Sequence, residues 1–305
     1  MLNILLWEDI LINKMLTIFS VPKSFQKEFS TIQFNAIKSW ALFKPKPEII
    51  LFGNETGVAE ICKKLNLTHF PQIKTNQYQT PLLNDVFDKA QKIAKNSILM
   101  YVNSDIIFPQ NIMEIVFKIS KNFKTFLATG QRFELKIDKI ISFSDPRWSK
   151  DLTNRCRLEN QLRGPGWIDY FIFTKGLFKN IPPFALGRTF WDKWLIWRAI
   201  SSKYQVIDLS LDVAVIHQSH TYSYNKKDTK WIWEGPEAQE NIRLAGGWSH
   251  GYSLNETTHI YKNGEITVKK HNPVKQKLVC LFKSGLDKFS RQSLLLKIRY
   301  LMNWG

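Results

Sequence analysis

The chain has 305 residues, 44% of them hydrophobic, which is enough for a large globular domain and excludes a disordered chain. Its formal net charge of +17 leaves nucleic acid, an anionic membrane surface and anionic small substrates as candidate partners. Zinc-finger spacing and basic heptads are absent, so nucleic acid is disfavoured. The three widely spaced cysteines, Cys62, Cys156 and Cys280, make neither a disulfide framework nor a metal motif. They indicate a reducing compartment, and we expect a cytoplasmic protein.

The first half of the chain alternates strand-like and helix-like segments. Strands are predicted over 16–21, 48–52, 69–73, 97–102 and 126–128, and helices over 29–42, 58–65, 82–94 and 112–119. Pro109 is expected in the first turn of the last helix. The order predicts an α/β fold with a mainly parallel sheet and helices on both faces. Ligands bind beyond the carboxyl ends of such strands, so residues 21–23, 53–55 and 103–105 are expected to converge.

The second half is less regular. We predict helices over 149–162 and 189–204, strands over 168–173, 206–208 and 213–216, and a hairpin over 259–268. Residues 279–304 mix apolar and basic side chains, which indicates an amphipathic helix that packs on the domain or lies on a membrane. The expected organisation is an extension (1–15), one domain (16–270) and a basic tail (271–305). The glycine motifs of dinucleotide-binding dehydrogenases and P-loop NTPases are missing after the first strand.

Two aspartates stand where they could act on a nucleotide-linked substrate. Asp105 follows an apolar strand, and a carboxylate there can hold Mg²⁺ or Mn²⁺ on a diphosphate. Taken alone it is more often a turn residue. Asp192 lies among aromatic residues at a predicted helix start, where it could take a proton from a hydroxyl as general base. The pair Thr189 and Asp192 also fits a capping box, and the two roles are compatible.

Other polar residues are candidates for the same site. His217 could supply an imidazole to a metal or diphosphate, with a structural role about equally favoured. Strand alternation places His220 on the opposite face, so both bind one metal only if the strand ends between them. Asp169 is an acid in a β-rich segment, which needs a partner or faces a site. Arg132, Lys175 and Arg188 are cations that could hold phosphate, although surface cations are the default. Tryptophans such as Trp191 and Trp233 could stack on a sugar ring or simply anchor loops.

Four stretches of the second half resemble GT-A-fold glycosyltransferase-like proteins, the nucleotide-diphospho-sugar transferases. They begin at Gly166 (GWIDYFIF), Ile181 (IPPFALGRTFWDKWL), Ala214 (AVIHQSH) and Gly235 (GPEAQEN, followed by LAGG from Leu244). The resemblance extends from about Leu16 to Val268. It implies a GT-A fold in which a divalent cation, Mn²⁺ or Mg²⁺, meets the last acid of an Asp-x-Asp motif. Here that motif is Asn103-Ser104-Asp105, so its first acid is missing.

The resemblance also implies roles for individual residues. The implied donor-site residues are Val21, Pro22, Asn54, Glu55, Asn84, Asn103, Ser104 and Asp105. Asp105 and His217 would be the metal ligands, and Asp192 the catalytic base of an inverting enzyme. Asp169, Arg132, Trp191 and Trp233 are expected on the acceptor side.

The expected function is transfer of a sugar from a UDP- or GDP-sugar to the hydroxyl of an unidentified glycan or lipid-linked acceptor. The positive charge would suit anionic substrates and peripheral contact with an anionic membrane. A nucleotidyltransferase or pyrophosphorylase is the first alternative, although the glycine-rich basic loop that such enzymes need is missing after the first strand. A non-catalytic carbohydrate- or membrane-binding protein with the same fold is the second, because the acidic motif is incomplete.

Overall fold

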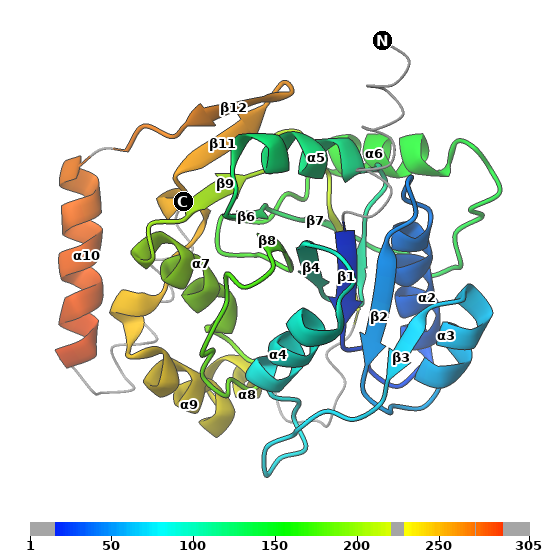
Figure 1. The fold of residues 1–305 in the computed structure, drawn as a ribbon, viewed down its shortest axis with the longest axis horizontal. Coiled ribbons are helices and arrows are strands. Elements are labelled where there is room, and N and C mark those ends of the chain that lie inside the picture. Colours follow the sequence, from blue (N-terminus) through cyan, green and yellow to red (C-terminus); the bar gives the residue numbers. More distant parts are fainter. Residues whose placement is uncertain (1–15, 221–228, 272, 289–305) are drawn as a thin grey trace.

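The structure is a computed structural model that describes residues 16–220, 229–271 and 273–288 (Figure 1). Among these residues, nine strands form one sheet in the order β12-β11-β9-β6-β8-β4-β1-β2-β3. The strands are β1 (Leu16–Ser20), β2 (Glu48–Phe52), β3 (Thr68–Phe70), β4 (Ile98–Val102), β6 (Phe126–Thr129), β8 (Tyr170–Thr174), β9 (Gln205–Asp208), β11 (His259–Lys262) and β12 (Glu265–Val268). Neighbouring strands are parallel except for the pairs made by β8 and β12. The predicted α/β class with a mainly parallel sheet is confirmed.

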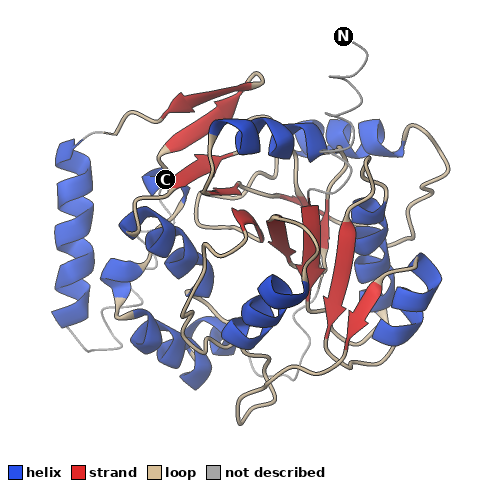
Figure 2. Ribbon diagram, in the orientation of Figure 1, coloured by secondary structure: helices blue, strands red, loops and turns tan. Residues whose placement is uncertain are grey.

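Helices cover both faces of this sheet (Figure 2). They are α2 (Glu28–Ala41), α3 (Val58–Leu65), α4 (Leu83–Ile93), α5 (Met113–Asn122), α6 (Trp148–Glu159), α7 (Trp191–Ser201), α8 (Thr229–Glu234), α9 (Pro236–Ala245) and α10 (Pro273–Lys288), with 3₁₀ turns η1 (Trp248–His250) and η2 (Leu254–Glu256). The alternation of strand residues divides the core in two. Met100 and Val102 of β4 face the cluster under α2, α3, α5 and α6, while Leu99 and Tyr101 face the cluster under α4 and α7.

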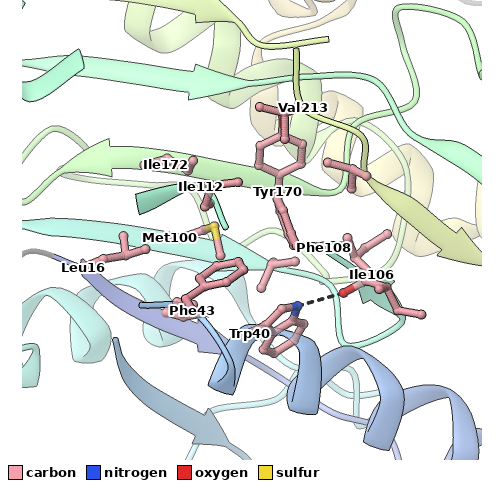
Figure 3. Close-up of a cluster of buried hydrophobic side chains, with 14 of the residues drawn as sticks. Leu16, Trp40, Phe43, Met100, Ile106, Phe108, Ile112, Tyr170, Ile172 and Val213 are labelled. Atoms are coloured by element: carbon pink, nitrogen blue, oxygen red, sulfur yellow. Dashed lines mark hydrogen bonds between the residues drawn. The ribbon is translucent and has the colours of Figure 1, made fainter. Parts of the chain in front are cut away.

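Figure 3 shows the first of these clusters at the end of β4. Trp40 of α2 is fully buried, and its indole Nε1 donates a hydrogen bond of 2.8 Å to the carbonyl of Ile106. Burying a large aromatic ring contributes a few kcal/mol, and truncating one to alanine costs about 3–5 kcal/mol. The contact therefore fixes the backbone beside Asp105 to the helix that follows β1.

A second, three-stranded sheet has the order β5-β10-β7. Its strands are β5 (Ile106–Ile107), β7 (Phe133–Leu135) and β10 (Ile216–Gln218). Strand β10 runs antiparallel to β5 and parallel to β7, so His217 lies opposite both Ile106 and Glu134. The sequence pattern predicted neither β5 nor β7, because two or three residues are too few to show a period.

Some predicted boundaries and caps are wrong. Pro109 lies before α5, whose first residue is Met113, so it is not in the first helical turn. Helix α7 begins at Trp191, and the capping box predicted for Thr189 and Asp192 does not form. The strand predicted over 213–216 is found over 216–218, and the one predicted over 69–73 ends at Phe70. Each error lies at an element end, where tertiary contacts decide the boundary.

None of the described helices is long and apolar enough to cross a bilayer. Helix α10 covers the first part of the tail predicted as a basic amphipathic segment, and residues 289–305 lie outside the described residues. The proposed extension over 1–15 lies outside them as well.

Candidate active site

The carboxyl ends of β1, β2 and β4 lie side by side, because these three strands are parallel neighbours. The Gln33 side chain of α2 connects two of the ends. Its Oε1 accepts hydrogen bonds from the Lys23 backbone N–H (2.7 Å) and from Ser104 Oγ (2.9 Å). Ser24 donates to Glu55 at 3.0 Å and so connects the ends of β1 and β2. The three segments predicted to converge are therefore adjacent.

The backbone of the Asn103–Asp105 turn is held from three sides. The N–H of Asn103 donates to the carbonyl of Asp169 (2.9 Å), and the N–H of Ile106 donates back to Asn103 (3.1 Å). The carbonyl of Asp105 accepts from both the backbone and the side chain of Gln218, at 3.3 and 3.1 Å. Because the turn is fixed in this way, the Asp105 carboxylate has a defined direction.

Two histidines meet that carboxylate. His217 Nε2 and His220 Nε2 each lie 3.4 Å from Asp105 Oδ2, and one ligand atom from each of the three residues lies within 4.8 Å of the others. The strand β10 ends at Gln218, between the two histidines, which is the condition under which sequence alternation allowed both to bind one metal. The ring of Phe29 packs against His220 with its centroid 5.0 Å away.

These residues fit a divalent cation. Asp105 Oδ1 is buried and has no hydrogen-bond partner among the described residues, as expected of an oxygen that a metal would satisfy. One carboxylate with two imidazoles suits Mn²⁺ better than Mg²⁺, which prefers oxygen ligands. Burial alone would raise the pKa of Asp105, but His217 and His220 outweigh it and hold that pKa well below its usual value.

Glu134 is a site residue that sequence reasoning missed. Its Oε1 contacts Nδ1 of His217, and its Oε2 accepts from Arg163 Nε at 3.0 Å. Burial would lower the pKa of His217, yet Asp105 and Glu134 raise it to about 9. Burial would raise the pKa of Glu134, but His217 and Arg132 lower it to about 2. An acid between Phe133 and Leu135, two residues after Arg132, was the available signal.

Asp169 and Arg132 lie in a buried network beside the turn. The guanidinium of Arg132 contacts Asp169 Oδ2 and lies 3.6 Å from Glu134. Asp169 Oδ1 accepts from the Asn103 amide at 2.8 Å, and Asn103 in turn accepts from the Tyr101 hydroxyl at 2.9 Å. Two predicted residues, Asp169 and Arg132, are therefore paired with each other.

An aromatic pair continues this network outward. Trp167 lies against the guanidinium of Arg132, 5.0 Å from its ring centroid, and Trp233 contacts Trp167 with ring centroids 5.6 Å apart. Trp233 is half-buried, whereas Trp191 is 4% exposed and packs on Tyr101 in the core. Trp191 is therefore a core residue, and Trp233 is the more accessible of the two predicted tryptophans.

Asp192 lies in the first turn of α7, and Oδ1 of its carboxylate is buried without a hydrogen-bond partner among the described residues. Burial raises its pKa, Lys193 opposes the shift, and the negative charge of Asp169 adds to it. Asn84 of α4 has a similarly orphaned Oδ1. Buried oxygens without partners are costly, so both side chains are candidates to accept a hydrogen bond from a ligand.

Cations surround the same edge of the sheet. The Lys23 side chain is exposed and lies over the Phe29 ring, with Nζ 4.5 Å from its centroid. Desolvation by neighbouring atoms nevertheless lowers the pKa of Lys23, and the charge of Asp105 opposes this shift. Arg188 pairs with Glu237 at 2.8 Å and adds a repulsive charge near Lys23. Lys175 instead donates to the carbonyl of Ala94.

The remaining predicted donor residues flank the ends of β1 and β2. Pro22 is buried, Val21 is half-buried, and Asn54 and Glu55 are exposed. Their placement is compatible with a nucleotide pocket, and their role stays a prediction.

No protein-family model and no curated protein sequence matches the chain. Solved structures with a similar fold include S. aureus TarS residues 1–349, with 13% identity over 67% of this chain and 60% of that chain, and a TM-score of 0.42. Glucosyl-3-phosphoglycerate synthase from Mycobacterium tuberculosis, in complex with Mn²⁺, UDP and phosphoglyceric acid, has 11% identity over 76% of this chain and 77% of that chain, with a TM-score of 0.43. GalNAc-T7 with UDP, GalNAc and Mn²⁺ has 13% identity over 77% of this chain and 49% of that chain, with a TM-score of 0.49.

The chain spans 36%, 60% and 37% of three S. aureus TarS chains that it matches. Sequence identities this low indicate a similar fold only, and TM-scores below 0.5 do not assign a function.

Proposed function

We propose that this chain is a GT-A glycosyltransferase that moves a sugar from a nucleotide diphosphate to an acceptor hydroxyl with inversion at the anomeric carbon. The observation that carries the proposal is the group of Asp105, His217 and His220 at the carboxyl edge of a parallel sheet, on the side of the turn where ligands bind in such folds. A divalent cation bound there would neutralise charge on the diphosphate leaving group.

The residues of the chain have separate duties in this proposal. Asp105, His217 and His220 hold the cation, and their two imidazoles suit a transition-metal ion such as Mn²⁺ better than Mg²⁺. Lys23 and Arg188 add positive charge near the place where the diphosphate would lie. Val21, Pro22, Asn54 and Glu55 line the nucleotide side, and Asn103 and Ser104 position the turn.

Asp192 is the proposed general base. Its raised pKa makes the carboxylate a better proton acceptor than an ordinary aspartate, and its orphaned Oδ1 is available to an incoming hydroxyl. Asn84 offers a second acceptor that could orient the same substrate. Trp233 and Trp167 present aromatic surface on this side and suit a sugar ring.

The test is a screen of nucleotide sugars with Mn²⁺, following nucleoside diphosphate release with candidate glycan and lipid-linked acceptors. UDP-sugars come first, since two of the similar structures hold UDP. Asp192→Asn should abolish transfer while nucleotide binding remains, and Asp105→Asn should weaken both. Asp138→Asn, an exposed carboxylate, is the matched control. Transfer that survives in Asp192→Asn removes the base assignment, and pyrophosphate release from a nucleoside triphosphate would indicate a nucleotidyltransferase instead.

A further inference from the structure

Helix α10 carries an apolar stripe that is largely exposed among the described residues. Leu278 and Leu281 are each 62% exposed and Phe282 is 46% exposed. Their spacing, with Gly285 one turn further, places them on one face of the helix. A side chain added at Gly285 would meet no atom within 4 Å, which shows independently that this face is open.

A different face of α10 attaches it to the domain. Lys283 is buried and donates to the carbonyl of Gly251 (2.6 Å) and to Glu256 (3.1 Å). Asp287 accepts from the backbone N–H groups of Trp248 and Ser249, so it caps the turn η1. The helix is therefore held through the face that carries Lys283, buried Leu286 and Asp287, and it lies at the outer edge of the molecule (Figure 1).

The C-terminal segment that contains α10 is strongly basic. Residues 273–305 contain seven lysines and arginines and one aspartate, a net charge of +6 out of +17 for the chain. A helix with an exposed apolar face in a strongly basic segment suits the interface of an anionic bilayer, where apolar side chains enter the acyl boundary and cations meet the headgroups. We infer that α10 docks the protein on an anionic lipid surface through Leu278, Leu281 and Phe282.

The test uses the full chain and vesicles of phosphatidylcholine, with and without phosphatidylglycerol, in a flotation assay. The chain should float with the mixed vesicles and not with phosphatidylcholine alone, and high salt should reduce binding. The triple variant Leu278→Ser, Leu281→Ser, Phe282→Ser should bind the mixed vesicles at least about tenfold more weakly. These side chains point away from the docked face, so nucleotide and metal binding should be unchanged.

The matched control carries Ile140→Ser, Leu158→Ser and Leu211→Ser, three apolar residues of similar exposure elsewhere on the surface. It should bind vesicles within about twofold of the unmodified chain. Undiminished binding by the α10 variant, or equal binding to phosphatidylcholine alone, overturns the proposal. So does a dimer in sedimentation velocity that the α10 variant loses without any vesicle binding, because the stripe would then contact a second copy.

Discussion

Asn103 donates its side-chain amide to Asp169 Oδ1 at 2.8 Å, in the position where an Asp-x-Asp motif has its first acid. Asp169 is itself paired with Arg132, and the Asn103 carbonyl oxygen accepts from Tyr101. The Asn103 amide can therefore donate to Asp169 and accept from Tyr101 at the same time, which a carboxylate cannot do. Asn103 therefore connects the turn to Asp169, the residue directly before β8.

Restoring the motif by Asn103→Asp should consequently harm the protein. The new carboxylate would lose the donated hydrogen bond and face buried Asp169, since only the amide can donate. We expect a loss of about 2–4 kcal/mol in unfolding free energy and no gain in Mn²⁺ affinity. Denaturant unfolding and Mn²⁺ titration measure the two. A variant that is as stable as the unmodified chain and binds Mn²⁺ more tightly would contradict the role assigned to the Asn103 amide.

Glu134→Gln tests how His217 is oriented. Glu134 contacts Nδ1, which leaves Nε2 directed at Asp105 and the proposed cation. Partners of this kind typically change metal affinity about 10–100-fold, and we expect a loss in that range. Glu265→Gln, on exposed β12, should have no effect. Equal Mn²⁺ affinity in both variants would assign Glu134 a purely structural role.

The titration of His217, Asp105 and Glu134 should give the metal-free protein a pH at which its stability is greatest. The pKa of His217 is raised from 6.5 to about 9, so its contribution is complete below pH 6.5 and is lost as the pH rises through 9. The pKa values of Asp105 and Glu134 are lowered in the folded protein, so the stability that these carboxylates contribute is complete above their unfolded pKa values. That stability is lost on acidification. The melting temperature of the unmodified chain should therefore fall between pH 6.5 and 9.

His217→Gln should flatten that fall, whereas His259→Gln should leave it intact, because burial lowers the pKa of His259 and moves its titration below this range. Added Mn²⁺ should also remove the fall if it binds the same group. An identical slope in all three proteins would contradict the charge assignment.

Asp192→Asn should separate activity from stability. A raised carboxyl pKa means that folding favours the neutral form, so this stabilisation is complete below about pH 3.8 and lost as the pH rises through the folded pKa. The amide of Asp192→Asn is neutral at pH 7 and therefore keeps this stabilisation there. The melting temperature of the variant should rise by about 2–4 °C. Transfer should fall at least about a hundredfold. A melting temperature that drops instead would mean that the Asp192 carboxylate is already paired in the folded protein.

The sequence predicted the sheet well because its strands and helices are long enough to show a period. The segments over 48–52 and 58–65 match the observed elements residue for residue, and the ends of β1, β2 and β4 lie together as expected. Asp105 could be singled out because it follows a strand that is buried throughout.

The second sheet could not be predicted in this way. Glu134 lies on β7 and His220 follows the end of β10 at Gln218, and each of these strands is three residues long. Their positions depend on how β7 and β10, about 80 residues apart in the chain, are aligned with each other. The pattern of residues in a single sequence does not reveal this alignment. The omission of Glu134 and the undecided end of the strand before His220 have this common cause.

We propose that Asp105, His217 and His220 bind one divalent cation. Electron paramagnetic resonance of Mn²⁺ titrated into the nucleotide-free protein is the direct test of this binding. The account predicts one bound ion per chain, lost in Asp105→Asn and in the double variant His217→Gln, His220→Gln, and retained in Asp138→Asn. UDP should then tighten Mn²⁺ binding in the unmodified chain and in Asp138→Asn, and not in the variants of the three proposed ligands. Absence of bound Mn²⁺ with and without UDP, or equal binding in Asp105→Asn, would contradict it.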